Sequence, residues 1–178
     1  MYPVLRLAAE LVRHRSAPPL AFSETHVTTL TCLPNDIDPW MEMNNGRVMT
    51  LFDLGRVVLF RRMGMIPVMR ARRWAGAIAG SHIRYRRRVH LWQKVELRAR
   101  FLGYDERFSY AEQSMWRLSD GECSAHALLR MAVSSRDGLV PAPEVAAALG
   151  TAASPPLPGW ARAWIDAEAQ RPWPPARG

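Results

Sequence analysis

The stretch GRVMTLFDLGRVVLFRRM, from Gly46 to Met63, decides the fold expected of this chain. Its apolar side chains lie at nearly every angle around a helical wheel and form no single stripe: Val48, Met49, Leu51, Phe52, Leu54, Val57, Val58, Leu59, Phe60 and Met63. A helix that is apolar on nearly all faces is buried on nearly all faces. The sequence therefore predicts a central helix that other elements wrap, and Gly64 and Pro67 are expected to end it.

The segments around this helix have the alternating pattern of β-strands. One precedes it, from Phe22 to Leu33, and four follow it, beginning at Gly76, Lys94, Arg107 and Ser124. The connections between the later segments are short and turn-like, which favours an antiparallel meander. A curved antiparallel sheet of about five strands can wrap one helix. We predict an α+β fold of this kind, with extra helices at both termini.

Three parts follow from this pattern. Residues 1–20 are expected to hold an amphipathic helix, residues 21–140 the sheet and its central helix, and residues 141–178 a helical and proline-rich extension. The first helix carries an apolar stripe and is expected to pack on its own domain or on a sister chain; contact with a membrane surface is the weaker alternative. The stripe comprises Val4, Leu5, Ala8, Leu11 and Val12.

Composition restricts the class of protein. The chain has 178 residues, of which 48% are hydrophobic, enough for one domain with a core. The net charge of +8 fits nucleic acid, an anionic surface or a phosphorylated small molecule, but codon bias explains it as well. Nucleic-acid binding is not expected, because the chain has neither an aromatic–basic signature nor a helix-turn-helix pattern. Cys32 and Cys123 form no CxxC motif, which predicts a reducing, cytoplasmic location and no zinc site.

The loop before the central helix, NDIDPWMEMNNGR from Asn35 to Arg47, concentrates polar groups at a helix start. Ester or thioester hydrolysis needs a group that attacks or activates water, and donors for the developing oxyanion. Asp38 supplies the first in this hypothesis, and the free N–H groups near Asn45 and Gly46 supply the second. The alternative for Asp38 is a turn residue before Pro39. Asp36 is interpreted as a cap that holds the loop.

Other residues near the loop have open interpretations. Glu42 is exposed, pairs with an arginine, or shares a pocket with Asp38 and tunes it. The side chain of Asn44 suits capping. Asp53 and Arg56, three residues apart on the central helix, are expected to form a structural pair.

The run RYRRR is the strongest basic cluster, with Arg84, Arg86 and Arg88 expected on one face of a strand and Tyr85 and Arg87 on the other. Arginine forks suit phosphate groups, and the alternative is a solvated strand face. The histidines show no metal-ligand spacing, so neither a metal nor a cofactor is expected.

Taken in order, these motifs resemble the hot-dog-fold acyl-CoA thioesterases, in particular the 4-hydroxybenzoyl-CoA thioesterase-like branch. The resemblance covers about residues 22–135 and rests on Asp36-Ile37-Asp38, Met43-Asn44-Asn45-Gly46-Arg47, Asp53-Leu54-Gly55-Arg56, Ile83-Arg84-Tyr85-Arg86-Arg87 and Leu102-Gly103-Tyr104-Asp105.

The resemblance implies a homodimer or a dimer of dimers, with an active site at the subunit boundary and an acyl-CoA substrate. It places the nucleophile or general base on Asp38 and the carbonyl-polarising N–H groups near Asn45 and Gly46. It extends the expected substrate site to these residues: Asn44, Arg47, Arg84, Tyr85, Arg86 and Arg87.

One departure from the family is visible. Many relatives have His-Met-Asn-Asn where this chain has Glu42-Met43-Asn44-Asn45. The leading hypothesis is therefore a thioesterase in which Glu42 replaces the histidine. The second hypothesis is a degenerate member that binds acyl-CoA or a protein partner without turnover.

Overall fold

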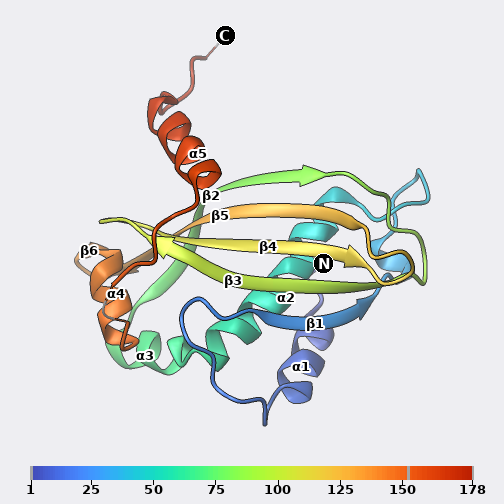
Figure 1. The fold of residues 1–178 in the computed structure, drawn as a ribbon, viewed down its shortest axis with the longest axis horizontal. Coiled ribbons are helices and arrows are strands. Elements are labelled where there is room, and N and C mark those ends of the chain that lie inside the picture. The colour runs from blue at the N-terminus through green and yellow to red at the C-terminus, as the bar shows by residue number, and fades with distance from the viewer. Residues whose placement is uncertain (1, 152, 178) are drawn as a thin grey trace.

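A computed structural model describes residues 2–151 and 153–177. Along the chain (Figure 1) the elements are α1 Val4–Arg13, β1 His26–Thr31, a short 3-10 turn Pro34–Asp36, α2 Asn45–Arg62, α3 Met65–Arg72, β2 Ala75–Tyr85, β3 Lys94–Tyr104, β4 Ser109–Arg117, β5 Cys123–Ser135, β6 Gly138–Val140, α4 Ala142–Ala148 and α5 Gly159–Gln170. The predicted central helix and antiparallel sheet are confirmed, but only β3, β4 and β5 form a meander: the expected pairing of the first two strands after the helix was wrong, because β2 pairs with β5.

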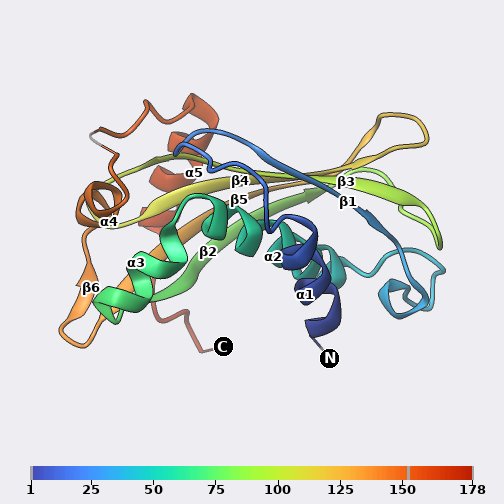
Figure 2. The same cartoon turned by 90° about the horizontal axis from the view of Figure 1, so that it is seen from below.

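The strands form one antiparallel sheet in the order β1-β3-β4-β5-β2, with β6 added beside β5. β2 follows the central helix in sequence but lies at the opposite end of the sheet from β1, because it pairs with β5 from Ala75–Ser134 to Tyr85–Ala125. Register shifts interrupt β2 near Ile78 and β3 near Gly103. Such irregularities bend strands, and the sheet curves over α2 (Figure 2).

The central helix α2 is buried as the sequence predicts. Leu51, Phe52, Leu54, Val58 and Leu59 each have 0% of their surface exposed. Leu51, Phe52, Leu54 and Leu59 pack against residues of the inner sheet face such as Val95, Leu97, Ala127 and Leu129. The hydrophobic effect therefore fixes this helix from nearly every side.

Arg56 is the charged exception inside α2, and its predicted pairing with Asp53 is confirmed. Its guanidinium also donates to Gln113 Oε1 at 2.6 Å, and Gln113 Nε2 donates to the carbonyl of Phe52 at 2.8 Å. Burial lowers the pKa of Arg56 to about 10. A buried polar group is tolerated when its partners are complete, so this network supports the fold.

The two faces of the sheet carry separate apolar clusters. Leu128 and Leu129 are neighbours on β5 and point to opposite faces, as alternation requires. Leu129 belongs to the core around α2, whereas Leu128 packs with Tyr110, Ala161 and the partly buried residues of α5. The C-terminal extension therefore covers part of the sheet face that α2 leaves open (Figure 1).

The structure differs from the expected local structure in three places. Pro67 does not end the helical region: it lies in the first turn of α3, where its missing N–H costs nothing. The sharp break occurs instead at Gly64, which has a φ of 73°. β6 was not expected, since three residues carry little pattern.

The third difference concerns the N-terminal helix, whose expected packing on its own domain is borne out by its polar side. α1 does pack on its own domain, but its predicted apolar stripe faces outward, and Glu10 is its buried residue. Among the described residues, no helix is long and apolar enough to cross a membrane. The two cysteines are free.

Candidate active site

A tight turn forms the loop in front of α2. Ile37 bridges Met43, the N–H of Asp38 donates to the carbonyl of Glu42 at 2.9 Å, and the N–H of Met41 donates to the carbonyl of Asp38 at 3.0 Å. The carboxylate of Asp38 accepts a hydrogen bond from the N–H of Trp40 at 2.9 Å. This is the common way in which an aspartate stabilises a turn.

Asp36 anchors the loop to the body of the protein. Its fully buried carboxylate forms ion pairs with Arg6 at 2.6 Å and with Arg47 at 2.9 Å, and accepts from the N–H of Leu33 at 3.0 Å. Burial favours the neutral acid, but the hydrogen bonds from Leu33, Arg6 and Arg47 outweigh it and lower the pKa of Asp36. The interpretation of Asp36 as a residue that holds the loop agrees with these contacts.

The start of α2 has one N–H group without a hydrogen bond. Asn44 is the N-cap, and its side chain accepts from the N–H of Gly46 at 2.8 Å. A Cβ at position 46 would lie 3.1 Å from that oxygen, so glycine suits the close cap. The N–H groups of Arg47 and Val48 donate to the carbonyl of Asn44. Within the described part of the chain, the N–H of Asn45 has no acceptor, as is usual for the first N–H groups of a helix.

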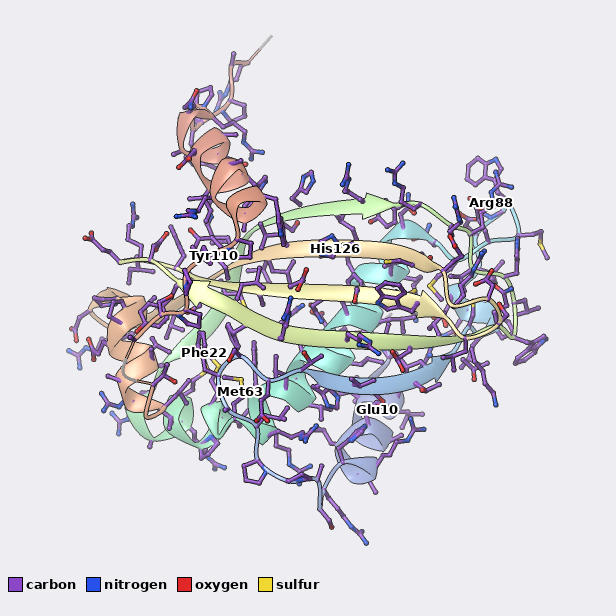
Figure 3. The ribbon with its side chains drawn as sticks, in the orientation of Figure 1. Glu10, Phe22, Met63, Arg88, Tyr110 and His126 are labelled. Atoms are coloured by element: carbon purple, nitrogen blue, oxygen red, sulfur yellow. The ribbon has the colours of Figure 1, made fainter. Side chains whose placement is uncertain are left out.

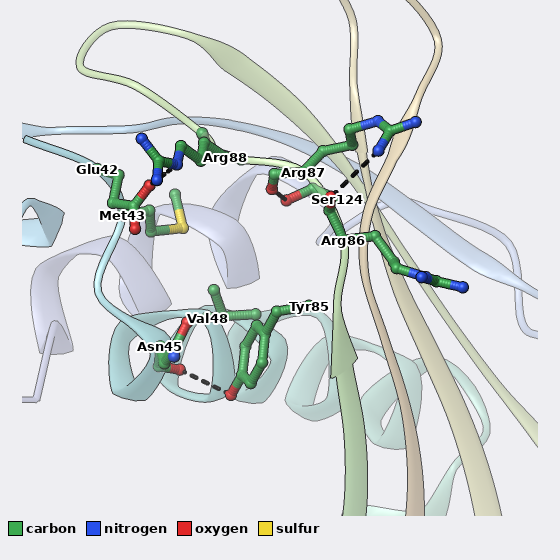
Figure 4. Close-up of a pocket in the computed structure, with 10 residues that line it drawn as sticks. Glu42, Met43, Asn45, Val48, Tyr85, Arg86, Arg87, Arg88 and Ser124 are labelled. Atoms are coloured by element: carbon green, nitrogen blue, oxygen red, sulfur yellow. Dashed lines mark hydrogen bonds and ion pairs between the residues drawn. The ribbon is translucent and has the colours of Figure 1, made fainter.

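A pocket of about 210 Å³ opens beside this helix start (Figure 4). The loop, α2, the end of β2 and β5 line it: Glu42, Met43, Asn45, Val48, Tyr85, Arg86, Arg87, Arg88, Val89 and Ser124. The hydroxyl of Tyr85 donates to the carbonyl of Asn45 at 3.3 Å, and burial raises the pKa of Tyr85. The pocket therefore combines an acid, a helix start and several arginines.

Glu42 is the acid of this pocket. Its Oε2 lies 2.8 Å from Arg88 Nε, as the dashed line in Figure 4 marks. That same oxygen is buried and forms no hydrogen bond with any residue that the structure describes, so the contact with Arg88 is an ion pair without hydrogen-bond geometry. A buried carboxylate oxygen without a hydrogen bond retains its capacity to accept a proton or a water molecule.

Comparison with protein families identifies the superfamily of the chain. The model of the Thioesterase-like superfamily matches residues 32–165, about three quarters of the chain.

The chain belongs to the thioesterase-like superfamily.

Curated relatives and solved structures agree with this membership. Protein THEM6 of Xenopus laevis is 37% identical over 101 residues, which cover 57% of this chain and 49% of that protein. The chain thus spans about half the length of the first curated relatives it matches.

Two solved structures show the shared hot-dog fold. The probable thioesterase YbaW of Escherichia coli has a TM-score of 0.65 at 16% identity, covering 70% of this chain and 96% of YbaW. Protein SAV2348 of Staphylococcus aureus, solved in complex with CoA, has a TM-score of 0.63 at 13% identity. The match covers 79% of this chain and 92% of SAV2348. At these identities the likeness establishes the fold of this superfamily member.

The structure brings five of the predicted site residues of this thioesterase-like chain into one pocket: Glu42, Asn45, Tyr85, Arg86 and Arg87. Asp38 does not line that pocket, and its catalytic role stays a prediction. Asn44 and Gly46 form the helix cap, and Arg47 is paired with Asp36, so their roles toward substrate also stay predictions.

The expected alternation of the basic run was wrong. Arg84 lines a different cavity, between β2 and α5, while Arg86 and Arg88 line the pocket together with Tyr85 and Arg87. The cause is the end of β2 at Tyr85. The N–H groups of Arg86 and Arg87 both donate to the carbonyl of Ser124, at 2.8 and 3.3 Å, which breaks the strand alternation.

Sequence reasoning missed five lining residues of the thioesterase-like pocket: Met43, Val48, Arg88, Val89 and Ser124. Arg88 belonged to a basic run that was already noted, and Met43 and Val48 flank the polar loop. Ser124 carried no signal, because only the pairing of β2 with β5 brings it to the pocket. Among the residues described, there is no group of three or more side chains suited to a metal ion.

Proposed function

We propose that this chain hydrolyses an acyl-CoA thioester to the free acid and CoA. One observation carries the proposal: a single pocket is lined both by Asn45, whose N–H at the start of α2 finds no acceptor among the described residues, and by Glu42, whose buried oxygen forms no hydrogen bond with any of them. Membership of the superfamily and the CoA complex of SAV2348 support the choice of substrate class. The 4-hydroxybenzoyl-CoA thioesterase-like branch is part of the proposal.

In this mechanism the N–H of Asn45 donates to the thioester carbonyl oxygen. Negative charge grows on that oxygen as water attacks the carbonyl carbon, and a fixed donor at the positive end of a helix stabilises it. The N–H of Gly46 is already used by the Asn44 cap. Of the two N–H groups expected to stabilise the oxyanion, only that of Asn45 is therefore kept in the proposal.

Glu42 is the general base of this mechanism. It takes a proton from the attacking water, whose oxygen bonds to the carbonyl carbon. The carbon–sulfur bond then breaks with its electron pair going to sulfur, and protonated Glu42 returns the proton to the leaving CoA thiolate. Glu42 is preferred over Asp38 because it lines the pocket, whereas the carboxylate of Asp38 is bonded to its own turn at Trp40. Glu42 also occupies the position where many relatives have histidine, another proton acceptor.

Arginines at the pocket rim are proposed to bind the phosphate groups of CoA. Arg86 is exposed, and no hydrogen bond or ion pair of its side chain occurs among the described residues; Arg87 is paired with the exposed Glu122 at 2.9 Å. Guanidinium groups bind phosphates bidentately and are easily drawn from exposed ion pairs. Arg88 instead holds Glu42.

A second copy of the chain is proposed to complete the assembly. β2 is a long edge strand that, among the strands the structure describes, pairs with β5 alone and leaves its other side open. Unpaired edges invite strand addition, and this edge begins among small residues and ends at Tyr85 in the pocket. Pairing across β2 would bring two pockets near one interface, in a homodimer or a dimer of dimers. The free cysteines support the proposal of a reducing, cytoplasmic location.

The test is a panel of acyl-CoAs, with the released thiol detected by a chromogenic reagent. Glu42→Gln is expected to lower the turnover rate by roughly 10² or more, the range for loss of a general base. Glu96→Gln is the matched control, since Glu96 pairs with Arg98 on β3 outside the pocket, and it is expected to keep the wild-type rate. Glu42→His is expected to retain activity, because imidazole accepts a proton.

Asp38→Asn separates the two acids. Loss of turnover in Asp38→Asn with normal turnover in Glu42→Gln would move the base to Asp38. If both variants keep the wild-type rate, the proposed site is wrong. If the wild type releases no thiol from any substrate yet binds acyl-CoA, the second hypothesis, a binding member of the superfamily without turnover, replaces the first.

A further inference from the structure

The N-terminal helix α1 is attached to the protein by its polar side. Arg6 reaches Asp36 at 2.6 Å and also donates to the carbonyl of Thr31 at 2.9 Å. Glu10 is 1% exposed and accepts from the hydroxyl of Thr28 on β1; Figure 3 shows Glu10 at the junction of α1 and β1. Buried, paired charges are costly to expose or to separate, so these contacts fix the rotation of the helix.

Because the polar side is held inward, the apolar stripe points away from the protein. Val4 is 64% exposed, Leu5 86% and Val12 60%, and Ala8 is exposed between them. Leu7 alone packs against the core cluster. A row of exposed aliphatic side chains on one helix is unusual for a surface in contact with water and marks an interaction site.

The charges around the stripe have one sign. Both acids that α1 contacts, Glu10 and Asp36, are buried and paired. The exposed charged side chains at the C-terminal end of the helix are arginines. Arg15 follows the stripe, and the exposed Arg61 of α2 donates to the carbonyl of Leu11 at 2.6 Å. Arg13 instead turns toward β1, pairs with Glu10 and donates to the carbonyl of Thr29. The outer surface of this helix is therefore apolar and cationic.

We infer that α1 docks on an anionic phospholipid surface, with its apolar stripe in the headgroup–acyl boundary and its arginines at the phosphates. Interfacial helices bind in this way, through buried apolar area combined with attraction to anionic lipid. Long arginine side chains reach the headgroups from a helix lying in the membrane plane. Stripe-to-stripe packing of two copies is disfavoured, because it gathers the arginines of both copies without an exposed acid from α1 to neutralise them.

Vesicle flotation of the full chain tests this inference. Vesicles of phosphatidylcholine alone are compared with vesicles that also contain phosphatidylglycerol. Wild-type protein is expected to float with the anionic vesicles and to be released by high salt. Leu5→Asp is expected to weaken binding by roughly tenfold or more, the effect of withdrawing one leucine from apolar burial.

Leu118→Asp is the matched control, since Leu118 is 49% exposed in the turn between β4 and β5, and it is expected to bind as wild type does. Arg15→Gln is a second variant that leaves the stripe intact and should weaken binding to anionic vesicles only. Circular dichroism confirms that each variant is folded, and the acyl-CoA assay in solution should be unchanged by Leu5→Asp whether or not the chain proves to be a hydrolase.

The inference is overturned if the wild type floats with neither vesicle, or if folded Leu5→Asp floats as well as wild type. It is also overturned if Leu5→Asp changes the oligomeric state in light scattering while wild type ignores vesicles, because the stripe then binds a second copy.

Discussion

Helices α1 and α2 bury opposite kinds of side chain. α2 is held by apolar side chains on most of its circumference, whereas α1 is held by Arg6 and Glu10 and turns its apolar stripe outward. Periodicity identifies the apolar face of a helix, but it does not say which face the rest of the protein covers. For α1, the neighbouring surface offered Asp36 and Thr28, and these polar partners decided the orientation.

The comparison predicts that one substitution has very different effects in the two helices. Leu54→Ala in α2 removes a side chain with no exposed surface and should lower the free energy of unfolding by about 2–5 kcal/mol. Leu5→Ala in α1 removes one that is 86% exposed and should change it by less than about 0.5 kcal/mol. Urea denaturation of both variants gives the values. Equal losses would mean that the stripe of α1 is covered in solution.

Acid should weaken the packing around His26, which lies edge-on to His14 at the end of α1 and 3.1 Å from Arg62 of α2. Burial, with His14 and Arg62 nearby, lowers the pKa of His26 from 6.5 to about 4. The unfolded chain then binds a proton at a higher pH than the folded chain does. The stability from neutral His26 is complete above pH 6.5 and is lost as the pH falls from 6.5 towards 4.

The loss in the free energy of unfolding from protonation of His26 amounts to at most about 3 kcal/mol. His14, whose pKa is also lowered by burial, adds to it in the same direction. Asp36 contributes in a lower pH range. Because its pKa is lowered, the folded protein loses the stability from ionised Asp36 only when the pH falls below the ordinary value of 3.8. Urea denaturation between pH 7 and pH 4 measures how the free energy of unfolding changes with pH, and this change should be smaller in His26→Gln. A wild-type stability that is constant over this range would contradict the prediction.

The smallest predicted effect concerns the charge of Glu10, whose side chain lies between α1 and β1. Glu10→Gln keeps the size of the side chain but weakens its pairing with Arg13 at 2.8 Å and with His14. The expected loss is about 1 kcal/mol in the free energy of unfolding. Glu24→Gln, at an exposed acid that accepts from the N–H of Ala21, is the control and should cost less than about 0.5 kcal/mol. Equal losses of unfolding free energy in the two variants would show that the charge of Glu10 does not help to attach α1.

Much of the candidate site was predictable, because local patterns specify local geometry. The run Asn44-Asn45-Gly46 in front of an apolar segment predicted the helix start, and the structure has its cap there. The same reasoning placed Asp38 at the reaction centre; the structure shows a turn contact of its carboxylate and Glu42 in the pocket, and the catalytic role of Asp38 stays a prediction. Both acids lie in one short loop, and sequence spacing does not tell which carboxylate faces inward.

The sequence by itself determined the central helix, the meander of β3, β4 and β5 and the polar loop at the helix start, since each follows from a local pattern of apolar and turn-forming residues. Only the tertiary structure decided three further features: which face of α1 is buried, which arginines share the pocket, and the place of Ser124 beside them. Each depends on the partner that another part of the chain supplies. Asp36 and Thr28 orient α1, and the carbonyl of Ser124 turns Arg86 and Arg87 out of the strand. Such partners are distant in sequence, so no local pattern records them.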